Sequence, residues 1–122
     1  MSVESEKSDE KEVIHASDLY GYTHYLYGEA FLGSYRGMRY RVAREPLKKV
    51  FYSPEEEWAK DATFLVSVWP EPYSYEKTPD EKKQSFSFPF TEEGRLMAVK
   101  CLNRQYFIRK PEWDAAMDAH WI

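Results

Sequence analysis

An alternating pattern between residues 30 and 44, AFLGSYRGMRYRVAR, constrains the fold more than any other part of the chain. Met38, Tyr40 and Val42 lie on one side of an extended chain and the arginines between them on the other, because successive side chains of a strand point to opposite faces. Arg36–Gly37 interrupts the pattern, and glycine readily adopts the positive φ that a tight hairpin turn requires. The pattern therefore predicts an antiparallel hairpin with one buried face and one basic face.

Three further stretches have the residue types of β-strands. Residues 19–27 are rich in tyrosine, residues 62–69 (ATFLVSVW) are mostly apolar, and phenylalanine recurs at every second position over residues 86–90. The segment 72–90 is expected to form a second hairpin that turns at TPDE, residues 78–81. Together these segments predict an antiparallel sheet of about five strands.

The C-terminal part of the chain predicts one main helix and one short helix. Thr91 is a good N-cap residue, and the two glutamates after it suit the positive end of a helix. The apolar stripe expected at helical spacing consists of Leu96, Val99, Leu102 and Tyr106. Pro111 begins the short helix, whose large apolar residues are Trp113, Met117 and Trp121. The expected fold is therefore α+β, with the main helix packed on one face of the sheet.

A further short helix is expected in the segment YSPEEEWAKDA, just before the strand at 62–69. Ser53 suits the N-cap, Pro54 suits the first helical position, and Glu56 completes a capping box. The strand that follows leaves room for only a few helical residues.

A chain of 122 residues is expected to form one domain. Residues 1–12 contain five acids, two lysines and no aromatic residue, which predicts a disordered acidic tail before a single domain at 13–122. Aromatic residues make up 17% of the chain, which predicts a core rich in rings. The single cysteine, Cys101, and the lack of a long apolar run are typical of a cytoplasmic protein that does not enter a membrane.

No motif for catalysis, a cofactor or a metal is evident. His15, His24 and His120 lack the spacing of metal ligands, and Cys101 falls inside the predicted helix, where it is expected to fill the core. Glycine-rich phosphate-binding loops are absent from the sequence. The chain is therefore not expected to be an enzyme, and only a concave pocket that held His24 and Glu29 together would favour one.

Acidic residues are concentrated between residues 50 and 93, where ten carboxylates face four lysines. A dense acidic surface on a small rigid domain can imitate a phosphate backbone and occupy a cationic groove on a nucleic-acid enzyme. The residues expected to form this surface, with Trp58 as an exposed anchor, are Glu55, Glu56, Glu57, Trp58, Asp61, Glu71, Glu76, Asp80 and Glu81. Acidic residues also keep proteins soluble, and that interpretation stays open.

A basic strip offers an alternative, direct binding of nucleic acid. The strip consists of Arg36, Arg39, Arg41, Arg44, Lys48 and Lys49, and six of the ten tyrosines fall between residues 18 and 44. Tyrosine rings and arginines together can form a platform for single-stranded nucleic acid. However, Tyr40 alternates with Arg39 and Arg41, so rings and cations are expected on different faces of the sheet. The strip can equally pair with acids of this chain or of a protein partner.

Three segments resemble small uncharacterised proteins encoded on conjugative elements and prophages of gut Firmicutes. The segments are YLYGEAFLGSYRGMRYRVAREPL (25–47), VWPEPYSYEKT (68–78) and FPFTEEGRLMAVKCLNRQY (88–106). The resemblance covers roughly residues 18–108, and its motifs are structural, so no active-site residue carries over. Such elements commonly carry proteins that blunt host defence, including anti-CRISPR and antirestriction proteins. The resemblance therefore implies an inhibitor that occupies a surface of a host nucleic-acid-processing enzyme, such as a CRISPR effector.

Overall fold

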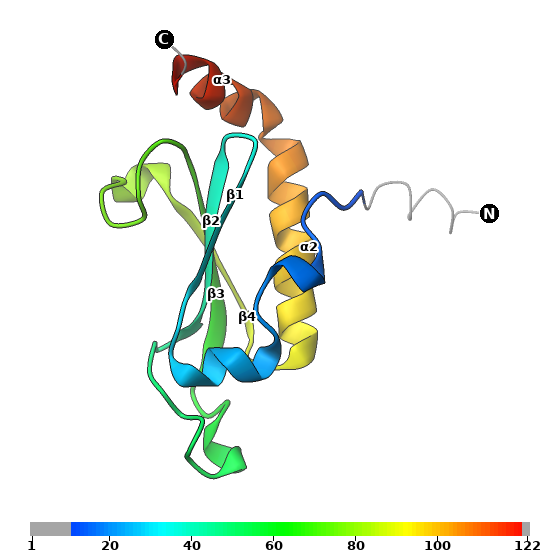
Figure 1. Ribbon diagram of the computed structural model, residues 1–122, viewed down its shortest axis with the longest axis vertical. Helices are drawn as coiled ribbons and strands as arrows, with labels where there is room; N and C mark the ends of the chain where they lie inside the picture. The colour runs from blue at the N-terminus through cyan, green and yellow to red at the C-terminus, as the bar shows by residue number, and fades with distance from the viewer. Residues whose placement is uncertain (1–10, 121–122) are drawn as a thin grey trace, which may run out of the picture.

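A four-stranded antiparallel sheet lies at the centre of the computed structural model, which describes residues 11–120 (Figure 1). Its strands lie in sequence order and are β1 (Phe31–Tyr35), β2 (Met38–Glu45), β3 (Thr63–Pro70) and β4 (Gln84–Pro89). Two helices follow, α2 (Glu92–Ile108) and α3 (Lys110–His120), and α2 runs along one face of the sheet (Figure 1). The α+β class is confirmed, but the sheet has four strands rather than about five.

The hairpin between β1 and β2 turns where the sequence predicts it. Tyr35 pairs with Met38, and the two residues between them, Arg36 and Gly37, have φ values of 44° and 92°. Positive φ at both central positions is typical of the two-residue turns that match the twist of a hairpin. Gly37 is also required sterically, because a Cβ there would overlap the carbonyl oxygen of Trp113 in α3.

The core lies between α2 and the inner face of the sheet. Met38, Tyr40 and Val42 are buried on that face, as predicted. The buried or partly buried rings around them include Phe64, Phe86, Phe88, Phe90, Tyr106 and Trp113. Burial raises the pKa of the Tyr40 phenol to about 12. The predicted core rich in rings is therefore present.

Two predictions for α2 have different outcomes. Thr91 caps the helix, since its hydroxyl oxygen accepts a hydrogen bond from the amide of Gly94 at 2.9 Å. Leu96, by contrast, is 43% exposed and was wrongly assigned to the core. Gly94 and Ala98 face the sheet instead, and Leu96 lies two residues, or about 200° around the helix, from each of them.

The tyrosine-rich segment 19–27 is not the predicted strand. The structure contains two 3-10 helices in this part of the chain, Ala16–Asp18 and Tyr22–Tyr27, and the second ends at Gly28, whose φ is 82°. Tyr25 and Leu26 are adjacent and both fully buried, which a strand with one covered face does not permit. The ring of Tyr25 packs edge-on against Phe64, 5.0 Å between centroids. Burial among rings therefore outweighs the strand preference of tyrosine.

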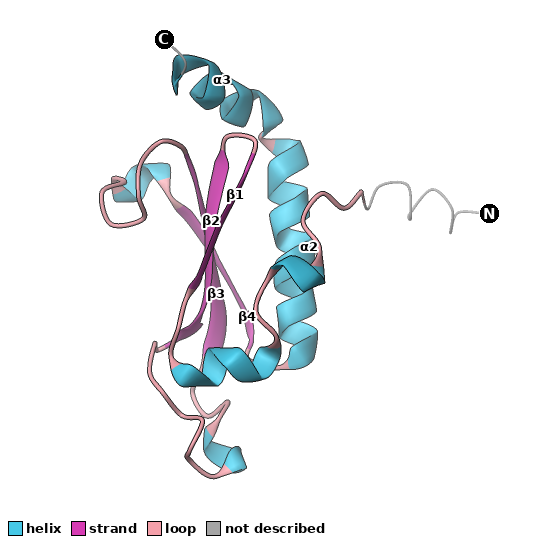
Figure 2. Ribbon diagram, viewed as in Figure 1, coloured by secondary structure: helices cyan, strands magenta, loops and turns pink. Residues whose placement is uncertain are grey.

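The two long connections differ from the predictions as well (Figure 2). The segment before β3 forms only a 3-10 turn, Glu55–Glu57, and its N-cap position is Pro54 rather than Ser53, so the predicted capping box is wrong. The second hairpin joins β3 to β4, and residues 71–83 form its loop with a 3-10 turn at Asp80–Lys82. Neither residues 19–27 nor residues 72–77 form a strand, which accounts for the lower strand count.

Part of the predicted N-terminal tail, residues 1–10, lies outside the described residues, as does Trp121. Near the start of the described residues, Ile14 is buried in the core and its amide donates a hydrogen bond to Asn103 of α2. No helix within residues 11–120 has the length and apolar character needed to cross a membrane.

Candidate functional site

The predicted acidic surface divides into two groups at opposite ends of β3. Glu55, Glu56, Glu57 and Asp61 precede the strand, whereas Glu71, Glu76, Asp80 and Glu81 follow it. A strand of this length spans about 23 Å. Figure 1 shows the two connections at opposite ends of the sheet. The nine residues therefore do not form one surface.

The group before β3, which we name the acidic turn (residues 55–61), is the denser one. All four of its carboxylates are exposed, and the glutamate side chains form no ion pair with any described residue. Only Lys60 opposes them within the turn. Asp61 has a φ of 52°, a left-handed conformation that aspartate tolerates better than most residues, and it returns the chain to β3.

Arg44 and Trp58 hold the acidic turn from beneath. The Arg44 Nε and Nη2 atoms donate to the Trp58 carbonyl oxygen at 3.1 and 3.0 Å, and Nη1 donates to the Pro46 carbonyl oxygen at 2.7 Å. The indole Nε1 of Trp58 donates to the Ser53 carbonyl oxygen at 3.1 Å. Trp58 is half-buried against the core rather than exposed as predicted, and it supports the turn.

The group after β3 is a closed loop with little excess charge. Trp69 Nε1 donates to the Tyr73 carbonyl oxygen at 2.8 Å, and Thr78 Oγ1 donates to the Ser74 carbonyl oxygen at 2.6 Å. Three lysines in the loop offset its four acids. The Nζ atom of one of these lysines, Lys83, lies 3.6 Å from Oδ1 of Asp80. This loop is therefore a weaker candidate for recognition of a cationic surface.

The basic strip is also divided. Arg39 and Arg41 lie on the outer face of the sheet, opposite the buried Tyr40, as predicted. Arg44 shares the inner face with Tyr40 and is 1% exposed, so it does not continue the outer strip. The ring that approaches Arg41 is Tyr75, which comes from the loop after β3 and lies 4.8 Å from the guanidinium carbon. Within the 18–44 window, the ring of Tyr35 lies 5.8 Å from the guanidinium carbon of Arg36 at the hairpin turn, whereas Tyr40 is buried on the face opposite Arg39 and Arg41.

A cavity of about 390 Å³ lies between the end of β2 and the acidic turn. It brings together side chains that the sequence analysis placed in two separate sets. Its charged lining consists of Arg44, Lys48, Lys49, Glu57, Lys60 and Asp61, a net charge of +2. Burial lowers the pKa of the Arg44 guanidinium, and the electrostatic interaction with Tyr22, which favours the charged form, offsets only part of that shift. Lys60 is the charged lining residue that belongs to neither the predicted acidic surface nor the predicted basic strip.

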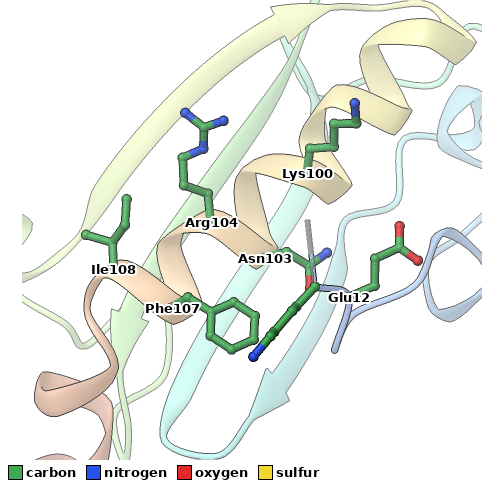
Figure 3. Close-up of a pocket in the computed structure, with 7 residues that line it drawn as sticks. Glu12, Lys100, Asn103, Arg104, Phe107 and Ile108 are labelled. Carbon is green, nitrogen blue, oxygen red and sulfur yellow. The ribbon is translucent and has the colours of Figure 1, made fainter. Parts of the chain in front are cut away.

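A second cavity, of about 240 Å³, lies on the outward side of α2 (Figure 3). Lys100, Arg104, Phe107 and Ile108 of the helix line it together with Glu12 from the N-terminal segment. Phe107 and Ile108 are 37% and 63% exposed. The sequence predicts a single apolar stripe for α2, and Phe107 and Ile108 lie outside it. Exposed apolar residues beside an arginine are common at protein interfaces.

The residues weighed for catalysis or metal binding lie apart. His24 Nε2 and Glu29 Oε1 are 2.7 Å apart, but both side chains are exposed and neither lines the two cavities. Within residues 11–120 no group of histidine, cysteine and carboxylate side chains is arranged to hold a metal ion. Cys101 is half-buried against the core, and burial raises the pKa of its thiol to about 11, which suits a packing role.

No protein-family model, curated protein or solved structure matches this chain.

Proposed function

We propose that this protein is a non-catalytic binding module that attaches to a basic surface of a protein partner through the acidic turn. The observation that carries the proposal is the way in which the turn is presented. Glu55, Glu56 and Glu57 are adjacent and exposed, and none of them forms an ion pair with a described residue. The turn beneath them is fixed by two hydrogen bonds from Arg44 to the Trp58 carbonyl oxygen and by one from the Trp58 indole to the Ser53 carbonyl oxygen.

Rigid presentation of charge favours binding for two reasons. Like charges placed side by side attract an oppositely charged partner over distance and speed its association. A segment that is already ordered loses less conformational entropy when it binds. The acidic turn combines both properties, whereas the loop after β3 is nearly neutralised by its own lysines.

The partner that suits this surface carries a cationic groove of the kind that holds a nucleic-acid backbone. The resemblance to proteins of conjugative elements and prophages narrows the proposal to a host nucleic-acid-processing enzyme, such as a CRISPR effector or a restriction enzyme. The protein would then act as an inhibitor by occupying the groove, and it would need no catalytic residue of its own.

The test compares two charge-neutralised variants in a capture experiment from host extract. The first variant carries Glu55→Gln, Glu56→Gln and Glu57→Gln. The second is a matched control at the other end of β3, with Glu76→Gln, Asp80→Asn and Glu81→Gln. We expect the first variant to lose a partner that the wild-type protein and the control retain, and duplex DNA to displace that partner in competition. Circular dichroism verifies that both variants fold.

Retention of the same partner by the first variant would refute the role of the acidic turn. Loss of the partner in a third variant, Lys100→Gln with Arg104→Gln, would move the interface to the outward side of α2.

A further inference from the structure

We propose that the cavity between β2 and the acidic turn binds a small phosphorylated molecule. The site is separate in chemistry from the acidic turn, because its lining has a net charge of +2 and it recognises an anion rather than a basic surface. Its volume of about 390 Å³ falls within the range of small-molecule sites in proteins.

Arg44 provides the strongest argument for an anion. The side chain is 1% exposed and all three of its nitrogen atoms donate to backbone carbonyl oxygens, which are neutral. No described carboxylate lies within ion-pair distance of it. A buried charge without a counter-charge is costly, and proteins normally pair it. An anion in the cavity that Arg44 lines would supply the missing charge.

The lysines of the site are attached to fixed backbone. The amides of Val50 and Phe51 both donate to the Leu26 carbonyl oxygen, at 2.7 and 3.0 Å. Gly28 approaches the peptide between Lys48 and Lys49 so closely that a Cβ would lie 2.9 Å from its atoms. The segment that carries these two lysines is therefore held against the 3-10 helix Tyr22–Tyr27 before any ligand arrives.

Lys60 completes the cationic lining from the opposite side, at the end of the acidic turn. Several cations that converge on one point suit a phosphoryl group, which carries up to two negative charges and several acceptor oxygens. Glu57 and Asp61 line the same cavity and repel an anion, but they accept hydrogen bonds from hydroxyl or amino groups. The lining therefore favours a phosphate monoester with an organic part that carries such donors.

The probes for the test are inorganic phosphate, adenosine monophosphate and a short single-stranded oligonucleotide, titrated into isotope-labelled full-length protein at constant ionic strength. We expect saturable shifts of the amide resonances of residues 44–61 with both small phosphates, and tighter binding of the nucleotide. Removal of one positive charge in Lys60→Gln should weaken binding about fivefold, the effect of one charge at contact distance in water. Glu57→Gln should strengthen binding by a similar factor, since it removes a repulsive charge.

The matched control is Lys100→Gln, which removes a lysine on α2 outside this cavity and should leave both affinities unchanged. The proposal is overturned if chloride produces the same shifts, if neither phosphate saturates, or if Lys100→Gln weakens binding as much as Lys60→Gln. Tighter binding of the oligonucleotide, with shifts that extend over Arg39 and Arg41, would overturn it in favour of a polymer. None of these results depends on Glu55 or Glu56, so failure here leaves the proposed protein interface standing.

Discussion

Asn103→Ala is expected to detach the N-terminal segment from α2 and to destabilise the protein. The Asn103 side chain is 6% exposed and lies in the middle of α2. Its Oδ1 accepts hydrogen bonds from the amides of Val13 and Ile14, at 2.7 and 3.0 Å. Its Nδ2 donates to the carbonyl oxygen of Ile14 at 2.8 Å and to that of Val99 at 3.0 Å. One amide group therefore joins residues about ninety positions apart in the sequence.

The magnitude follows from what the substitution leaves behind. The Ile14 amide and carbonyl lose their partner in a buried position, and each such loss costs about 1–3 kcal/mol. The Val13 amide is only partly buried, so water replaces its partner at smaller cost. The expected loss in the free energy of unfolding is therefore about 2–6 kcal/mol. This is a large share of the roughly 5–15 kcal/mol typical of a domain.

Urea denaturation and hydrogen exchange measure the effect. We expect a lower midpoint of unfolding, together with faster exchange of the amides of Val13 and Ile14 than of amides in β2. Arg104→Ala is the matched control, because it truncates an exposed side chain one position along the same helix. An Asn103→Ala midpoint equal to that of the control would refute the reasoning, and so would unchanged exchange at Ile14.

Four further substitutions or modifications test single features. Gly37→Ala forces a side chain into a left-handed turn and against the carbonyl of α3, so it should lower the free energy of unfolding by at least about 1 kcal/mol in a denaturant titration. Thr91→Ala removes the N-cap of α2 and should cost about 1 kcal/mol in the same assay, whereas Thr91→Ser should cost little. A hydrogen bond from Arg95 lowers the pKa of Glu92 in the folded protein. The stability that this hydrogen bond adds is therefore present above the ordinary carboxyl pKa, and it is lost as the pH falls through the lower pKa of the folded state. Glu92→Gln should therefore flatten the acid side of the melting-temperature profile, and an unchanged profile would count against the pair. The pKa of Cys101 is raised to about 11, so iodoacetamide near pH 8 should alkylate the native thiol about a hundredfold more slowly than the unfolded one, and equal rates would contradict its burial.

The features of the fold that the sequence predicts correctly are those determined by neighbouring residues. The turn at Arg36–Gly37 follows from the alternation on either side of it, and Thr91 begins α2 because its own hydroxyl satisfies the amide of Gly94. The strand at 62–69 is apolar enough to be recognised without its partners, and β3 covers Thr63–Pro70. Each of these features depends on local backbone geometry or local hydrogen bonds.

The errors arise where distant packing decides the structure. Tyr25 and Leu26 become buried together only because Phe64 and the other core rings surround them, and nothing in residues 19–27 specifies those neighbours. Leu96 fits the spacing of a helical stripe, but the face of α2 that packs inward carries Gly94, which lies close to the Pro89 carbonyl, and Leu96 faces solvent. Propensity and periodicity describe a segment alone and do not determine which face it buries.

The candidate sites were predicted in part, and one residue shows why. Arg44 was grouped with Arg39 and Arg41, yet it has the same even parity along β2 as Met38 and Val42, and that parity already assigns it to the inner face. The cavity itself could not be predicted, because it needs Lys60 to return to Lys48 and Lys49 across the end of the sheet. The separation of the two acidic groups could likewise not be predicted, because it depends on how β3 runs through the fold.

Arg44 connects the two proposals physically. The same guanidinium that holds the Trp58 carbonyl, and so fixes the acidic turn, lines the cavity proposed to take an anion. A neutral donor could hold the turn without the desolvation cost of a buried arginine, and no carboxylate among residues 11–120 lies within ion-pair distance of Arg44 to offset that cost. An anion bound in the cavity would supply a counter-charge for the Arg44 guanidinium. The nitrogen atoms that donate to Trp58 are part of the same rigid, planar guanidinium group that lines the cavity. An anion bound in the cavity would therefore also stiffen the turn that presents Glu55 and Glu56.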